Sequence, residues 1–178
     1  MEDPGSIHYE DPFADPPELR EPARRLRGRL PSPVTIWTAG PEDSIAGLTV
    51  SSILISEGEP TRIHGLINDT TELWDAIHVT RKFVVHVLER EHRILAERFA
   101  ARRPSPGGLF GDIEMDQTQW GPAIRPLRTR AYCSLESLTP SGFQQLVTAT
   151  IDRFDLGDLK IPLVYFRGRY RTLDEPTL

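Results

Sequence analysis

The sequence predicts a mainly β protein, a mostly antiparallel barrel with helices at its edges. About seven segments show the apolar alternation or the short apolar runs that are typical of strands. Only two clear helical segments interrupt this series of strands. The strands also follow one another too closely for repeated strand–helix–strand units, which a parallel sheet would need. These observations favour an antiparallel barrel over a parallel sheet covered by helices.

The chain has 178 residues, a length that fits one domain with a sizeable core. Residues 1–16 are acidic and rich in proline. We therefore expect a flexible arm there and a single domain over residues 17–178. The arm has neither the basic nor the apolar region of a secretory signal, so we expect no signal peptide.

The first half of the domain contains one helix and three strands. Residues 17–28 predict a short basic helix that Pro22 breaks or restarts. Residues 33–39 and 48–56 alternate as strands, and the turn-forming sequence GPEDS lies between them. Residues 62–68 form the third predicted strand.

The first clear helix follows this strand. Asp69 lies three residues before Glu72, a spacing that predicts a helix start with Asp69 as the N-cap. Leu73, Trp74 and Ile77 then form one apolar face. The remaining segments are predicted as a strand, a helix with an apolar stripe, a loop rich in glycine and proline, and three longer strands: residues 83–88, 89–103, 103–112, 128–138, 143–154 and 162–173.

Composition excludes several classes of protein. The net charge of −5 gives no global basic field that would attract nucleic acid or an anionic membrane. No segment approaches the roughly 18 consecutive apolar residues of a membrane-spanning helix. Cys133 is the only cysteine, which excludes an internal disulfide framework and predicts a reducing, cytoplasmic location. We expect Cys133 to be a small buried side chain rather than a nucleophile.

The familiar sequence signatures of catalysis are absent. There is no dinucleotide-binding glycine motif, no phosphate-binding P-loop and no nucleophile elbow. The five histidines show no helical spacing that would bring two ligands and a third together. We therefore predict no metal site, and no catalytic side chain is assigned.

The segment IAGLTVSSI, residues 45–53, has an unusual composition for a strand. Thr49, Ser51 and Ser52 place three hydroxyls in four residues, shortly after Gly47. One interpretation is an edge strand with hydroxyls on its solvent face. The other is a ligand that lies against the backbone and is held by hydroxyls and amides.

The order of several segments resembles the flavin reductase-like family of the FMN-binding split barrel. These segments are PSPVTIWTAG, AGLTVSS, NDTTELWDAI, KFVVHVL and RILAERFA, followed by WGPAIRPL, AYCSL and PLVYFRGRYRTL. The resemblance covers about residues 31–173. It implies a split β-barrel of antiparallel, Greek-key type, with bound FMN and with NADH or NADPH as the hydride donor. It favours the ligand interpretation of residues 45–53.

The resemblance also implies where the cofactor binds. Residues 49–52 would lie against the flavin, and the hydroxyls and helix N-terminus at residues 68–71 would meet its phosphate. Plain helix capping without a ligand is the alternative for the second segment. The candidate cofactor-binding residues are Thr49, Val50, Ser51, Ser52, Asn68, Thr70, Thr71, Arg81 and His86.

Three segments depart from the family pattern. SEGEPT has one proline where the family has two, and His86 stands where asparagine is usual. Many members carry a Gly-Asp-His motif before the penultimate strand, whose histidine helps to position the nicotinamide. Here the corresponding segment is SGFQQLV, with Gln144 in the place of the histidine.

The function implied is that of an FMN-binding flavin reductase, which passes a hydride from NADH or NADPH to flavin. The departure at Gln144 leaves two alternatives open. One is a flavin-binding carrier, sensor or partner subunit without nicotinamide activity, and the other is a split-barrel enzyme with another flavin-like cofactor. The resemblance further implies a homodimer and a possible partner monooxygenase. The arm and the loop at residues 103–112 are the segments expected to reach the second subunit.

Overall fold

The computed structural model describes residues 22–173, so the predicted arm and the first part of the predicted helix at 17–28 lie outside the described residues. Its helices are α1 (Pro22–Arg27), α2 (Glu72–Thr80), the 3₁₀ helix η1 (Arg90–His92) and α3 (Arg93–Phe99). Its strands are β1 (Ser32–Pro33), β2 (Thr35–Ala39), β3 (Ala46–Val50), β4 (Ile53–Ser56), β5 (Arg62–Ile67), β6 (Lys82–Val87), β7 (Met115–Thr118), β8 (Gly121–Ile124), β9 (Arg130–Ser141), β10 (Gln144–Asp155), β11 (Leu163–Phe166) and β12 (Arg169–Thr172).

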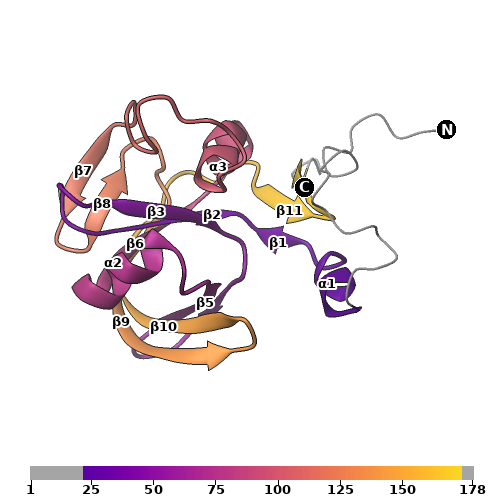
Figure 1. The fold of residues 1–178 in the computed structure, drawn as a ribbon, viewed down its shortest axis with the longest axis horizontal. Helices are drawn as coiled ribbons and strands as arrows, with labels where there is room; N and C mark the ends of the chain where they lie inside the picture. The colour runs from indigo at the N-terminus through magenta and orange to yellow at the C-terminus, as the bar shows by residue number, and fades with distance from the viewer. Residues whose placement is uncertain (1–21, 174–178) are drawn as a thin grey trace.

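A curled, antiparallel sheet of seven strands forms the body of the fold, in the order β3-β2-β6-β9-β10-β5-β4. Figure 1 shows the strands wrapping around the interior, with α2 lying against the β2–β3 side and the β9–β10 hairpin extending below. The predicted mainly β, antiparallel split barrel is confirmed. None of the helices within residues 22–173 is long and apolar enough to cross a membrane.

The two edges of this sheet are consecutive in the chain. β3 pairs with β2 and β4 pairs with β5, so the chain changes partners at Ser51 and Ser52. The prediction of one continuous strand at residues 48–56 is therefore wrong. Alternating apolar residues on both sides of the serines resemble one strand, because the sequence pattern does not reveal which neighbour each half pairs with.

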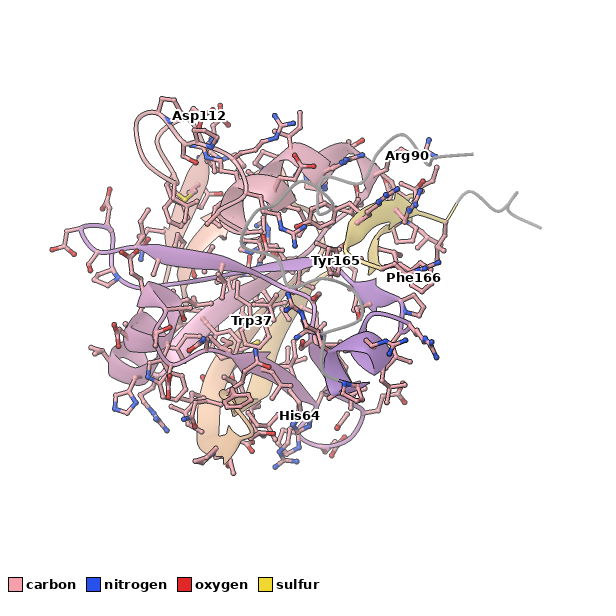
Figure 2. All side chains as sticks on the ribbon, turned by 45° about the vertical axis from the view of Figure 1, so that its right-hand side comes forward. Trp37, His64, Arg90, Asp112, Tyr165 and Phe166 are labelled. Carbon is pink, nitrogen blue, oxygen red and sulfur yellow. The ribbon has the colours of Figure 1, made fainter. Side chains whose placement is uncertain are left out.

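Trp37 lies at the centre of the main core, as Figure 2 shows. Its ring stacks on Phe83 with the centroids 4.8 Å apart. Gly65 faces the other side of the indole, where a Cβ would come within 2.5 Å of the Trp37 ring. α2 closes one side of this core with the predicted apolar residues Leu73 and Ile77, both buried.

Cys133 on β9 is fully buried in the same core, as expected. Burial and the nearby charge of Asp152 raise the pKa of its thiol, so the group stays protonated at neutral pH. The sulfur therefore acts as a small apolar side chain.

A second core lies between α3, β8 and the small sheet β1-β11-β12. The predicted helix at residues 89–103 is shorter than expected, since the regular helix spans only Arg93–Phe99 after one 3₁₀ turn. Its Phe99 and Phe110 of the following loop pack edge to face on the β3 strand. A Cβ at Gly47 would come within 2.6 Å of the Phe99 ring, so the glycine permits this close packing.

The predicted strand at residues 162–173 is a hairpin rather than one strand. β11 and β12 pair with each other, and Arg167 and Gly168 form the turn with φ angles of 51° and 81°. Two positive φ angles are typical of the tight turns that join two-stranded hairpins. The β7–β8 hairpin was not predicted, because its strands have only four residues each, β7 is mostly polar and β8 contains a glycine and a proline.

Candidate functional site

The ends of three strands meet on one side of the barrel. The Leu66 amide of β5 donates to the Ser52 carbonyl at 3.1 Å. On the other side of β5, Gln145 of β10 pairs with Ile67. This register brings the β3–β4 connection, the segment after β5 and the start of β10 together. We call the polar residues at this meeting point, Ser51, Ser52, Asn68, Thr70 and Thr71, the candidate cofactor site.

Ser51 and Ser52 supply the hydroxyls with free bonding capacity. Both residues are half-buried. Across residues 22–173 neither serine hydroxyl has a hydrogen-bond partner. A half-buried hydroxyl normally finds a partner in protein or water, so these two are available to a ligand.

Thr49 and Val50 are already used by the fold. The Thr49 hydroxyl donates to the carbonyl of Ala96 in α3 at 2.8 Å. The carbonyl of Val50 accepts from the Thr35 hydroxyl at 2.6 Å, and the Val50 side chain is buried. The structure thus divides the predicted segment, since its first half holds α3 and β2 and its second half faces the candidate cofactor site.

The segment from Asn68 to Thr71 forms a compact turn before α2. The Asn68 side-chain oxygen accepts from the Thr70 amide and from the Thr70 hydroxyl, both at 3.1 Å. The Thr71 hydroxyl donates to the Asn68 carbonyl at 2.8 Å and accepts from the Trp74 amide at 3.3 Å. The hydroxyls are therefore held in place next to the positive end of the α2 dipole.

Thr71, not Asp69, is the N-cap of α2, so the prediction of an Asp69 cap is wrong. Asp69 instead accepts a hydrogen bond from Gln145 of β10 at 3.2 Å. Both residue types are good N-caps, and the sequence does not show that β10 would supply a partner for the carboxylate. The contact holds the negative charge of Asp69 beside β10.

Arg81 lies away from these residues. It is the C-cap of α2 and adopts a left-handed conformation with φ 60°. At about 1.5 Å per residue, α2 separates it from Thr71 by roughly 15 Å. Its guanidinium donates to the carbonyl of Glu136 at 3.5 Å, on β9. The structure does not bring this cation to the candidate cofactor site.

His86 lies inside the fold. Nδ1 is 3.0 Å from the Ile36 carbonyl, and Nε2 accepts from the Ile124 amide at 3.0 Å. These contacts require a neutral ring with its proton on Nδ1. Burial, helped by the charge of Arg130, lowers the pKa of His86 to about 3. The ring connects β6 with β2 and β8, and it is separate from the exposed hydroxyls.

The β9–β10 hairpin ends beside the candidate cofactor site, which sequence analysis did not reveal. Gln144, the residue at the position of the family histidine, is the first residue of β10 and pairs with Ser141. Phe143 in the turn is 94% exposed. Only the strand register places this turn next to the segment after β5, and alternation of residue types alone does not define that register.

Two surface grooves lie elsewhere on the described chain. One, of about 350 Å³, is lined by Arg90, Arg93, Leu163, Tyr170, Arg171 and Thr172. Figure 2 labels Arg90 and Tyr165 on this side of the molecule, near β11. The other, of about 540 Å³, is lined by Glu89, Arg128, Arg130, Asp155, Leu156, Gly157, Asp158 and Lys160. Neither of these two grooves includes a candidate cofactor residue.

Glu89, Glu91 and His92 form the one cluster of possible metal ligands in the described chain. The ammonium of Lys160 lies 3.4 Å from Glu89 and 3.0 Å from Glu91. This ammonium lowers the pKa of Glu91. A protein cation therefore already balances the carboxylates of the cluster.

The donor set of the candidate cofactor site fits a phosphorylated flavin. FMN carries a phosphate with several strong acceptor oxygens, and hydroxyl and amide donors suit these oxygens. Ser51, Ser52 and the N-terminal end of α2 offer such donors on one surface. The five residues of the site include no arginine or lysine, so the donors that they offer are hydroxyls and amides.

Comparisons with known proteins give a consistent picture. The family described as "Flavin reductase like domain" matches residues 27–174. The chain is 26% identical, over 89% of its length and all of the relative, to the reductase component of 4-hydroxyphenylacetate 3-monooxygenase from Thermus thermophilus. It is 28% identical, over 86% of its length and 84% of the relative, to the NADH-dependent FMN reductase AsuE2 from Streptomyces nodosus subsp. asukaensis. The solved structure of the NADH:FAD oxidoreductase SgcE6 from Streptomyces globisporus superposes with a TM-score of 0.78 at 20% identity, covering 90% of this chain and all of that one.

Proposed function

Because the chain belongs to the flavin reductase-like domain family, we propose that it is an FMN-binding flavin reductase that uses NADH or NADPH. The observation that carries this proposal is the pair of half-buried hydroxyls of Ser51 and Ser52, which have no hydrogen-bond partner within residues 22–173 and lie between the two edge strands. The named relatives include a reductase component and an NADH-dependent FMN reductase, which supports the same activity here.

The protein's part in the reaction is to bind and orient. The flavin, once bound, supplies the hydride-accepting chemistry, so no side chain needs to act as an acid or base. Ser51 and Ser52 hold the cofactor from the strand side. The first amides of α2 hold its anionic end. Thr70 and Thr71, whose hydroxyls donate to Asn68, fix the turn that presents these amides. Fixing the cofactor in one orientation lets a second ring approach at reacting distance, roughly 3–3.5 Å.

We propose FMN rather than FAD as the preferred flavin. The donors of the site suit one compact anionic group, as FMN has, and the two surface grooves are separate from them. One relative is named for FMN and one structural neighbour for FAD, so direct comparison of the two flavins is the deciding measurement.

We propose that the protein is a homodimer and serves a partner monooxygenase. Ser51 and Ser52 are only half-buried, so a flavin held there would remain exposed to water, and a second subunit would cover it. Leu156 and Leu159, 80% and 98% accessible, are exposed apolar side chains that subunit contact would also bury. The Thermus relative is a component of a monooxygenase, which supports the second part. The single buried cysteine is consistent with the proposed cytoplasmic location.

One specific observation favours a second candidate function. Gln144 stands at the turn of the hairpin, and no histidine follows His92 in the sequence. A flavin-binding protein without nicotinamide activity would fit that substitution. It would share the same cofactor site and differ only in reduction of the bound flavin.

The test combines binding and reduction. Calorimetry with FMN, FAD and riboflavin should give the tightest binding for FMN, because a charge-assisted hydrogen bond contributes roughly 1.5–3 kcal/mol. Anaerobic stopped-flow mixing with NADH and NADPH should then bleach the flavin absorbance. Equal affinities for FMN and riboflavin would refute the phosphate site. Flavin binding without bleaching by either nicotinamide would select the second candidate.

A further inference from the structure

An aromatic side chain is exposed to solvent at the turn of the β9–β10 hairpin. Phe143 is 94% exposed, whereas the other residues of the turn are small or polar. The turn joins two strands of twelve residues each, which pair with each other along their length. The hairpin therefore holds Phe143 on a rigid support.

The sheet brings the start of β10 to the candidate cofactor site, and Phe143 directly precedes this strand. Gln145 pairs with Ile67, the last residue of β5. Phe143 is two residues before Gln145, in the turn. The hydrogen bond between the Gln145 amide and the Asp69 carboxylate, 3.2 Å long, fixes the two segments at this point.

Phe143 lies just beyond the buried row of β10. Val147 and Ala149 of β10 are fully buried in the barrel core, and Gln145, two residues earlier, reaches Asp69 at the end of the barrel. Phe143 follows in the turn, where its side chain is 94% exposed. A large apolar ring thus stands in solvent just beyond the end of the core, near the segment that follows β5.

We propose that Phe143 is a stacking residue for a flat heteroaromatic ring bound at the candidate cofactor site. This proposal rests on the proposed function and adds a residue that determines ligand binding. The ring's partner is either the isoalloxazine of the flavin or the nicotinamide of the hydride donor, and both share the same chemistry. Aromatic rings pair in offset or edge-to-face arrangements, which a phenylalanine at a fixed hairpin turn supplies.

Variants at this position separate stacking from other roles. Phe143→Ala removes the ring, Phe143→Leu keeps apolar bulk without a π face, and Phe143→Trp keeps an aromatic ring. Phe154→Ala is the matched control, because Phe154 is an exposed phenylalanine at the far end of the same strand. Each protein is measured by calorimetry with FMN, by the KM for NADH and NADPH, and by light scattering.

Phe143→Ala and Phe143→Leu should weaken ligand binding by roughly five- to 150-fold, which is the range for loss of one stacked ring. The loss appears in the FMN affinity if the ring stacks on the flavin, and in the KM if it stacks on the nicotinamide. Phe143→Trp should retain binding within a few fold, and the Phe154→Ala control should match the unaltered protein.

Three results would overturn the proposal. The first is unchanged FMN affinity and unchanged KM in Phe143→Ala. The second is full retention of both by Phe143→Leu, which would make the contact merely apolar. The third is a fall in molar mass in Phe143→Ala, which would make Phe143 a subunit contact. If the unaltered protein binds no flavin, the proposed function fails as well. If the unaltered protein reduces flavin and Phe143→Ala has the same FMN affinity and the same KM, only this proposal is refuted.

Discussion

Acid should destabilise this protein through His86 in particular. The ring is fully buried and neutral in the folded chain, where its pKa is lowered to about 3 from 6.5. Below pH 6.5 the His86 ring binds a proton in the unfolded chain but stays neutral in the folded chain. The free energy of unfolding therefore falls as the pH drops from 6.5 toward 3, and the contribution is fully present above 6.5.

The size of the effect follows from this difference in pKa. One unit corresponds to about 1.4 kcal/mol. At pH 5 the folded state has therefore lost about 2 kcal/mol relative to neutral pH, which is a large part of a typical stability of 5–15 kcal/mol. Arg130 adds to the loss, because its positive charge lies close enough to lower the pKa further.

Urea unfolding of the unaltered protein and of His86→Asn, at several values between pH 7.5 and pH 5, isolates this contribution. Carboxylates titrate in both proteins, so the difference between the two free energies of unfolding reports His86. That difference should shrink by about 2 kcal/mol between pH 7.5 and pH 5. A difference that stays constant over this range, or an imidazole resonance of His86 that titrates near 6.5, would refute the reasoning.

Three further substitutions test the structure. Gly65→Ala should destabilise the fold by about 1–3 kcal/mol in thermal unfolding, because the added Cβ meets the Trp37 ring at 2.5 Å; an unchanged Tm would contradict this packing. Ser51→Val should keep the unfolding temperature and weaken FMN in calorimetry, whereas lowered stability with unchanged affinity would make the serine purely structural. Thr71→Ala should cost about 1 kcal/mol in urea unfolding through loss of the N-cap, and a change below experimental error would show that the cap is dispensable.

Local patterns in the sequence were sufficient for the fold class and for part of the core. The buried positions of Leu73 and Ile77 follow from helical spacing, and the burial of Cys133 follows from its apolar surroundings. The resemblance to the flavin reductase-like family, carried by the order of short segments, is confirmed by the match over residues 27–174. Such features depend on neighbours in sequence or on composition, so they can be read before the chain is folded.

Features that depend on distant partners could not be predicted. Two such features follow from the position of β5 between β4 and β10. They are the change of strand partner at Ser51 and Ser52, and the hydrogen bond from Gln145 to Asp69. The cofactor-binding role of the two hydroxyl segments stays a prediction, and the structure shows that they lie at neighbouring strand ends. The structure adds that the Thr49 hydroxyl donates to the Ala96 carbonyl, and that Arg81 lies at the opposite end of α2 from Thr71.

The connection at Ser51 and Ser52 couples ligand binding to the integrity of the sheet. These residues join the two edge strands of the described sheet, and edges are where a sheet opens first in local unfolding. A ligand held there binds only while both edges are in place, so it stabilises the closed barrel by mass action. At a ligand concentration of about 100 times Kd this amounts to about 2.7 kcal/mol. Amide hydrogen exchange in β3 and β4 should therefore slow on cofactor binding more than exchange in the central strands β6 and β9.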